Sequence, residues 1–272
     1  MFDFLKNLDK DLQKALMVQL RNLWTHTSTA IEGNTLTLGE TAFVLEEGLT
    51  VSGKPLKDHE EVVGHARAID LVYELVEAGG AFTEEQLFSL HKAVQVQKIV
   101  DVYKPVGGWK KEPNSTVAVV GGRQVVFEYA PPGDVPGLME KWFRLYHGII
   151  NSIKPEDSRL AMDAYVRLHV SFVRIHPFFD GNGRLARLIA NIPVLKAGLP
   201  PVVIPREERK QYIDALSAYH FTAGQIKRGN DLLPCPDALE PFAAFCEKAW
   251  GLSLSLVAEI RKIQEARNNL ST

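Results

Sequence analysis

The residues best suited to chemistry lie together in one short stretch, IHPFFDGNGRLAR, at residues 175–187. Pro177 cannot sit inside a preceding helix, and Gly181 and Gly183 allow backbone angles that are closed to other residues, so the stretch is predicted to be a loop between two helices. The second helix is expected to begin near Gly183. The first turn of such a helix binds anions, because it offers free backbone N–H groups and the positive end of the helix dipole.

The side chains around this turn indicate a polyphosphate and a hard metal ion. Arg184 and Arg187 are three residues apart and share one face of the second helix. Two guanidinium groups beside backbone amides suit a polyphosphate better than a single carboxylate. Asp180 would be unfavourable among anions alone, but Mg²⁺ is usually held by one or two carboxylates together with substrate phosphates. His176 stands at the start of the loop, where an imidazole can accept a proton from an attacking hydroxyl.

These features are informative only in combination. A single histidine before a proline is usually structural, and an isolated G-N-G turn is common. Residues 176–187, however, supply a base, a metal carboxylate, glycine amides and two arginines in an order that builds one phosphate site. No structural role requires all of them together, so the stretch predicts a catalytic site.

The stretch from His176 to Arg187 resembles the signature of the Fic family, HPFx[DE]GNGRxxR, at every specified position. This resemblance implies a helical core that transfers AMP from ATP to a Ser, Thr or Tyr hydroxyl of a target protein, with Mg²⁺ as cofactor. It implies that His176 is the general base and Asp180 the Mg²⁺ ligand. The residues that it assigns to the phosphates are Gly181, Asn182, Gly183, Arg184 and Arg187.

A second stretch, TSTAIEGN at residues 27–34, resembles the inhibitory motif of the same family, [ST]xxxE[GN], through Ser28, Glu32 and Gly33. By itself, Glu32 is an acidic residue at a helix C-terminus, where the dipole disfavours it by roughly 0.3–1 kcal/mol. Another group should therefore hold it there. The resemblance implies a bidentate pair with Arg187 that keeps this arginine from the γ-phosphate of ATP. The rival interpretation is a core helix that ends at Gly33 without regulating anything.

The elements that must position these residues are mainly helices. Apolar residues recur at three- and four-residue spacing through most of the chain, and Thr37 with Glu40 and Thr83 with Gln86 are capping-box patterns. The expected helices cover residues 8–31, 38–47, 56–78, 84–96, 135–150, 156–173, 183–197, 207–219 and 239–267, and residues 221–236 are expected to form a loop. The expected organisation is an N-terminal helical segment at 1–55 with the inhibitory motif, a Fic core at 56–220, and a C-terminal loop and helix at 221–272 packed on that core.

Residues 116–129 interrupt the helical pattern with two β-branched runs around Gly121 and Gly122, which predicts a β-hairpin. The resemblance implies that this hairpin is a flap on which the protein substrate docks by strand addition. It also implies that the segment containing Tyr212 closes the adenine pocket. Lys110 and His220 depart from the family pattern, in which Arg and Asn often occupy these positions.

Composition argues against several other classes of protein. The formal net charge of −2 and the pI of about 6.5 do not provide the basic surface that a nucleic-acid partner requires. The N-terminus has no continuous apolar run, so neither a signal peptide nor a membrane span is expected, and the protein is expected to be cytoplasmic. A homodimer is a common default for such a chain.

Three alternatives to adenylyl transfer stay open. The first is a hydrolase that uses Glu32 to position water and remove AMP from a modified protein. The second is a transferase with another nucleotide donor, although the complete GNGRxxR stretch disfavours the phosphate-transferring type. The third is a non-catalytic regulator that senses nucleotide.

Overall fold

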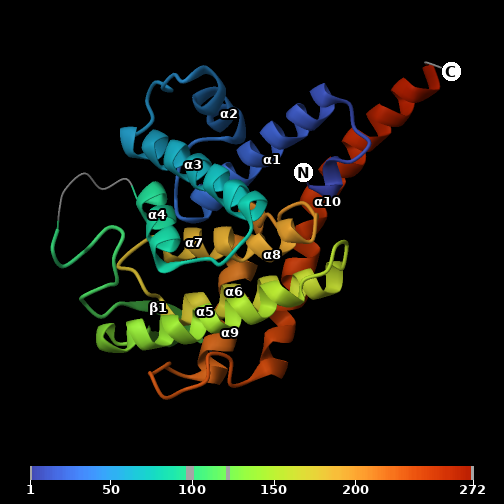
Figure 1. Ribbon diagram of the computed structural model, residues 1–272. Helices are drawn as coiled ribbons and strands as arrows, with labels where there is room; N and C mark the ends of the chain where they lie inside the picture. Colours follow the sequence, from blue (N-terminus) through green and yellow to red (C-terminus); the bar gives the residue numbers. More distant parts are fainter. Residues whose placement is uncertain (1, 96–100, 121–122, 271–272) are drawn as a thin grey trace.

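The structure is a computed structural model that describes residues 2–95, 101–120 and 123–270. It confirms the mainly α fold with one small β-hairpin (Figure 1). The helices are α1 (Lys10–Ile31), α2 (Leu38–Glu47), α3 (Leu56–Ala78), α4 (Glu84–Val94), α5 (Val135–Ser152), α6 (Ser158–Ile175), α7 (Asn182–Ile189), α8 (Asn191–Lys196), α9 (Arg209–Ala223) and α10 (Glu240–Leu270). The strands β1 (Ser115–Val120) and β2 (Arg123–Glu128) pair antiparallel, with Ser115 opposite Glu128.

The predicted capping boxes start two of these helices. At the start of α2, the Glu40 amide donates to the Thr37 hydroxyl at 3.2 Å, and the Thr37 amide donates to the Glu40 carboxylate at 2.7 Å. Thr83 and Gln86 make the same reciprocal pair at the start of α4. These bonds satisfy backbone donors that a helix N-terminus leaves free. The predicted end of α4 at Val96 and the glycine turn of the hairpin lie outside the described residues.

One predicted helix is divided in two. The spacing predicted a single helix over residues 183–197, but α7 ends at Ile189 and α8 begins at Asn191. Pro193 is the physical reason, because it has no N–H to donate to the carbonyl of Ile189 and its ring crowds that carbonyl. The buried Asn191 side chain stabilises the break by donating to the carbonyls of Arg187 and Val202.

The helix α9 continues beyond its predicted end at Tyr219 and stops at Ala223, so the following loop is shorter than expected. Arg174 of α6 is buried and donates to the carbonyls of Ala223 and Gly224 at 3.3 and 3.0 Å. It also donates to the carbonyl of Leu232. A buried guanidinium therefore satisfies carbonyls that the end of α9 leaves free and fixes the loop to the core.

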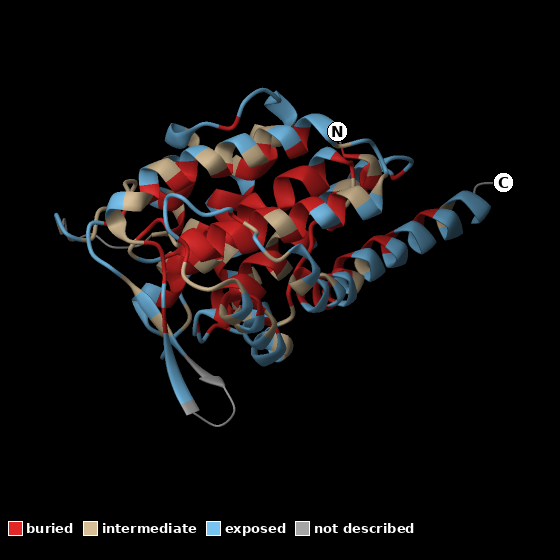
Figure 2. Ribbon diagram, turned by 90° about the horizontal axis from the view of Figure 1, so that it is seen from below, coloured by how far each residue is buried: buried red, intermediate tan, exposed pale blue. Residues whose placement is uncertain are grey.

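The apolar core surrounds α6 and includes α1. Leu16, Leu20 and Trp24 of α1 are almost fully buried and belong to the same cluster as Leu168 of α6. Figure 2 shows the buried residues gathered in the body of the molecule, while the C-terminal half of α10 extends beyond it. No helix in the described ranges is long and apolar enough to cross a bilayer. The predicted division of the chain near residues 55 and 220 stays a prediction.

Candidate active site

The predicted loop between two helices is present and closely fastened. The helix α6 ends at Ile175, and His176 follows in the left-handed region with φ 52° and ψ 59°. Gly181, with φ 80°, is the N-cap of α7, which begins at Asn182. The Asn182 carboxamide accepts from the Phe178 amide at 2.9 Å and donates to the Phe178 carbonyl at 2.8 Å. Its side chain therefore closes the loop, and its backbone amide is the group left to face a ligand.

Hydrogen bonding fixes the protonation of His176. The Nδ1 of His176 lies 3.2 Å from the carbonyl oxygen of Val173, which can only accept, so Nδ1 carries the proton. The other ring nitrogen, Nε2, then has a free lone pair. Burial and the nearby Lys110 cation lower the pKa of His176 to about 3. The imidazole is therefore neutral near pH 7 and can act as a base.

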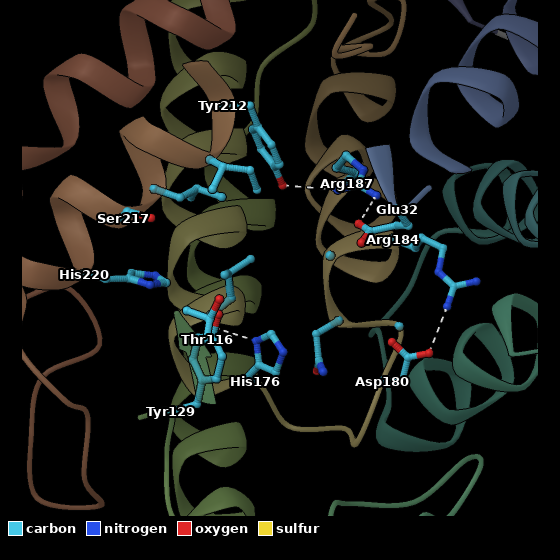
Figure 3. Close-up of a pocket in the computed structure, with 16 residues that line it drawn as sticks. Glu32, Thr116, Tyr129, His176, Asp180, Arg184, Arg187, Tyr212, Ser217 and His220 are labelled. Atoms are coloured by element: carbon cyan, nitrogen blue, oxygen red, sulfur yellow. Dashed lines mark hydrogen bonds and ion pairs between the residues drawn. The ribbon is translucent and has the colours of Figure 1, made fainter. Parts of the chain in front are cut away.

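A cavity of about 190 Å³ brings the predicted site residues together (Figure 3). His176 lines one side of it, while the backbone of residues 181–183 at the start of α7 and the two arginines line the other. Arg184 and Arg187 are only 5% and 2% exposed. Such deeply buried cations at a helix N-terminus make this end of the cavity a site for an anion.

Arg187 is held by several partners, and its contact with Glu32 differs from the expected one. One guanidinium nitrogen, Nη2, donates to a Glu32 carboxylate oxygen at 2.7 Å and to the Ser28 carbonyl at 2.9 Å. Nε donates to the Ser28 hydroxyl, and Nη1 donates to the Tyr212 hydroxyl at 3.3 Å. The predicted pairing of Glu32 with Arg187 is present, but the bidentate form is wrong because Ser28 and Tyr212 occupy the other nitrogens.

The end of α1 places Glu32 over the anion site. Gly33, with φ 103°, turns the chain away from the helix directly after Glu32. A Cβ atom on Gly183 would lie 2.7 Å from a Glu32 carboxylate oxygen, so this carboxylate rests against the first turn of α7. The Glu32 side chain keeps 41% of its surface exposed. It therefore occupies the mouth of the anion site without being sealed into it.

The turn that carries Glu32 is fastened to α3. The Asp58 carboxylate accepts from the Thr35 amide at 2.8 Å and from its hydroxyl at 2.6 Å. The Asn34 carboxamide donates to the Asp58 carbonyl and to the Glu61 carboxylate. Asn34, Asp58 and Glu61 are all buried. Four hydrogen bonds thus fix the residues that directly follow Glu32 and Gly33.

Asp180 fits the role of a ligand for Mg²⁺. Its side chain is 62% exposed and lines the cavity, and its carboxylate oxygen Oδ2 lies 3.4 Å from Nη2 of Arg184. Burial opposes ionisation, but Arg184, the Gly181 amide and Gln95 outweigh it and lower the pKa of Asp180. The group is therefore an ionised, hard oxygen donor beside the anion site, which suits an ion held by one carboxylate and substrate phosphates.

Sequence reasoning missed residues from distant segments that support the catalytic loop. His91 of α4 accepts from the Gly107 amide through Nδ1 at 2.9 Å, so its Nε2 donates to the Asp180 carbonyl at 3.1 Å. Tyr129, directly after β2, stacks on the His176 ring. Asn114 donates to the Phe178 carbonyl. No local pattern identifies these residues, since each contact joins segments far apart in the chain.

One wall of the cavity is lined by residues from α9 and the hairpin. Tyr212, Leu216, Ser217 and His220 face it from α9, and Thr116 faces it from β1. The predicted place of Tyr212 in the cavity is present, but its hydroxyl contacts Arg187 and also lies 3.1 Å from Nε2 of His169. Its role toward adenine stays a prediction.

Comparisons with known proteins identify related chains. A sequence model described as Fic/DOC family matches residues 81–193. A protein adenylyltransferase Fic from Drosophila grimshawi is 33% identical over 194 residues, which cover 71% of this chain and 36% of that protein. The chain thus spans about a third of the length of the curated relatives that it matches.

Solved structures share the fold. A Fic domain containing signaling protein from Bacteroides thetaiotaomicron superposes with a TM-score of 0.78 at 27% identity, covering 94% of this chain and 93% of that chain. A Fic family protein from Desulfovibrio desulfuricans superposes with a TM-score of 0.60 at 26% identity, covering 92% of this chain and 66% of that chain. The match to the first structure extends along nearly the full length of both chains.

Proposed function

The chain belongs to the Fic/DOC family, and from this premise we propose that it transfers AMP from ATP to a hydroxyl group of a target protein. The observation that carries the proposal is the placement of a neutral His176, with Nε2 free, opposite buried arginines at a helix N-terminus in one cavity. A base that faces a polyphosphate site is the arrangement that nucleotidyl transfer requires.

The chain's own residues would perform the transfer as follows. The amides at the start of α7, with Arg184 and Arg187, hold the phosphates, and Asp180 would hold a Mg²⁺ ion that neutralises phosphate charge. Nε2 of His176 accepts the proton of the attacking hydroxyl. The hydroxyl oxygen then bonds to the α-phosphorus as the bond to the β-phosphate oxygen breaks. The products are an AMP-protein phosphodiester and pyrophosphate.

The target protein is proposed to dock on the hairpin. Outward-facing side chains of β1 and β2 include Val117 and Val126, which are 59% and 62% exposed. In the described residues the two strands pair only with each other, which leaves their outer edges free for an added strand. An extended peptide on such an edge would bring its hydroxyl toward Thr116 and His176, at the base of the hairpin.

We further propose that Glu32 inhibits this activity. Its carboxylate neutralises Arg187 and covers the first turn of α7, where a phosphate would bind. A hydrogen bond to a charged group contributes about 1.5–3 kcal/mol, so removing the competitor should strengthen productive binding by roughly 10- to 100-fold.

The proposed transfer of AMP and its proposed inhibition by Glu32 are tested with three variants. Glu32→Gln is expected to raise the rate of AMP incorporation from ATP with Mg²⁺, measured by mass spectrometry on the chain itself and on candidate targets. His176→Ala in the same background is expected to abolish incorporation while ATP affinity, measured by calorimetry, stays similar. Glu47→Gln, at the exposed end of α2, is the matched control and should behave like the parent. Equal labelling of Glu32→Gln and the parent would contradict the inhibition, and transfer without His176 would contradict the mechanism.

A second candidate is hydrolysis of the AMP-protein bond. It is favoured by one observation, that the Glu32 carboxylate lines the same cavity as His176 and keeps 41% of its side chain exposed. It could therefore orient a water molecule. Incubation of the parent with an AMP-modified protein would release AMP if hydrolysis occurs, and Glu32→Gln should then abolish the release.

A further inference from the structure

Among the residues that the structure describes, one hydrogen bond orients the His176 ring. It runs from Nδ1 to the Val173 carbonyl at 3.2 Å and sets the tautomer. The backbone at His176 is in the left-handed region, which is uncommon for a residue other than glycine. One hydrogen bond still allows the ring to tilt about it. A further contact must therefore hold the plane of the ring if Nε2 is to keep one direction.

Tyr129 supplies that contact. The two rings are stacked with their centroids 3.7 Å apart and their planes 9° from parallel. Tyr129 is 9% exposed, and its ring also packs against Phe127 and the edge of His220. The phenol ring thus covers one face of the imidazole and is itself fixed by packing.

The backbone of Tyr129 is tied to the catalytic loop through Asn114. The Tyr129 amide donates to the Asn114 carbonyl at 3.2 Å, and the Asn114 carboxamide donates to the Phe178 carbonyl at 3.0 Å. The carboxamide oxygen of Asn114 accepts from the Lys110 ammonium, and the Lys110 amide donates to the Pro177 carbonyl. The segment before β1 is therefore bonded directly to residues 177 and 178, which follow His176, and Tyr129 after β2 is bonded to them through Asn114.

We propose that Tyr129, held in place by Asn114, is a positioning residue that fixes the His176 imidazole with Nε2 toward the cavity. This inference rests on the proposed function, in which His176 is the base. Asn114 and Tyr129, which flank the hairpin, then form one hydrogen-bonded unit with the catalytic loop. A shift of the hairpin is therefore transmitted to the ring of His176. Misplacement of a reacting group by about 1 Å costs up to roughly 100-fold in rate.

The experiment replaces Tyr129 in the Glu32→Gln background. Tyr129→Leu is expected to lower kcat by roughly 10- to 100-fold while KM for ATP changes less than about twofold, because the phosphate end is untouched. Tyr129→Phe keeps the stacked ring and is expected to retain activity within about threefold of its parent. Tyr103→Leu, the same substitution at a tyrosine that is 61% exposed and does not line the cavity, is the matched control.

A second readout does not depend on activity. The His176 ring is followed by NMR as a function of pH without nucleotide. The charged or titratable groups around it are Lys110 before the hairpin, Tyr129 after it, Asp180 in the loop and His220 of α9. Loss of the covering ring hydrates the imidazole, so its pKa is expected to rise toward the ordinary value of about 6.5 in Tyr129→Leu and to stay low in Tyr129→Phe.

Asn114→Ala provides a second test in case Tyr129→Leu does not fold. It removes side-chain hydrogen bonds but leaves the aromatic cluster around Tyr129 intact. It is expected to change kcat and the His176 titration in the same directions as Tyr129→Leu, to a smaller extent. An unchanged His176 titration in both Tyr129→Leu and Asn114→Ala would overturn the inference. A Glu32→Gln parent without any transfer would instead count against the proposed function, and the NMR measurement would still decide the role of Tyr129.

Discussion

At the scale of single residues, the site pairs a buried arginine with an acidic side chain and two hydroxyl groups. Arg187 is almost fully buried and meets a carboxylate, a hydroxyl and a phenol. Burial would lower the pKa of Arg187, but Tyr212 and Glu32 raise it. A buried cation requires an anion, and the Glu32 carboxylate supplies it in this structure. In the proposed transfer reaction, a phosphate would supply it.

His91 yields a prediction at this scale. His91→Leu removes the donor to the Asp180 carbonyl and the acceptor for the Gly107 amide, at a cost of about 1–1.5 kcal/mol for positioning Asp180. The Mg²⁺ concentration for half-maximal transfer in the Glu32→Gln background should therefore rise roughly five- to tenfold.

The control for this prediction is His91→Gln, whose amide can still donate to the Asp180 carbonyl and should restore part of the Mg²⁺ response. Thermal unfolding of both variants checks that the fold is retained. The assignment fails if His91→Leu and its parent need the same Mg²⁺ concentration.

At the scale of elements, the turn that carries Glu32 is held by hydrogen bonds from Asn34 and Thr35 to α3. Asp58→Ala removes the acceptor for the Thr35 amide and hydroxyl, so the turn after Glu32 loses its fastening. Transfer should rise several-fold although Glu32 is still present, because the loss of about 1–3 kcal/mol weakens the competitor. The measurement is AMP incorporation with ATP and Mg²⁺.

The same change in the Glu32→Gln background serves as the control. Asp58 is proposed to act only through Glu32, so Asp58→Ala should add nothing once Glu32 is replaced. Additive activation would mean that Asp58 affects transfer by another route.

The crossing of α3 and α4 gives a stability prediction. A Cβ atom on Gly64 would overlap the carbonyl oxygen of Ala93, a backbone atom that cannot move aside alone. Gly64→Ala should therefore lower the free energy of unfolding by about 1–3 kcal/mol. Gly148→Ala in α5, where a Cβ meets nothing within 4 Å, should raise it by about 0.4–1 kcal/mol. Urea unfolding of both variants measures the difference, and equal effects would contradict the close crossing.

Helix positions were largely predictable from local pattern, and the exceptions have physical causes. The capping residues Thr37 and Thr83 and the stop at Gly79 act within one turn of the chain, so spacing alone locates them. The helix break before Asn191 follows from Pro193. It was not predicted because the apolar residues around Pro193 keep the spacing of a continuous helix. The extension of α9 to Ala223 depends on Arg174 of another helix, which no local pattern reveals.

At the scale of the whole molecule, several histidines are buried in the neutral form. Burial lowers the pKa of His65, His169 and His220, in the last case to about 3. Their pKa in the unfolded chain is about 6.5, so the unfolded state binds more protons below that pH. Their contribution to stability is therefore complete above pH 6.5 and is lost as the pH falls toward the folded pKa.

The expected loss is about 1 kcal/mol for each histidine between pH 6.5 and 5.5, or roughly 3 kcal/mol for the three together. Urea unfolding across this range measures it. His65→Leu is a useful variant, because neither ring nitrogen of His65 has a hydrogen-bond partner among the described residues. It should reduce the pH dependence by about one proton, and an unchanged slope would show that His65 is not buried in its neutral form.

By itself, the sequence determined the loop and helix start at residues 175–187, the helical class and the hairpin. These follow from spacing and backbone preference over a few neighbouring residues, whereas the inhibitory role of Glu32 was implied by a resemblance and stays a proposal. Only the tertiary structure decided that Glu32 reaches Arg187 through one nitrogen, 155 residues along the chain, and that Tyr129 and His91 support the loop. Such contacts depend on how helices and the hairpin pack, because burial and hydrogen bonding between distant segments are properties of the assembled core.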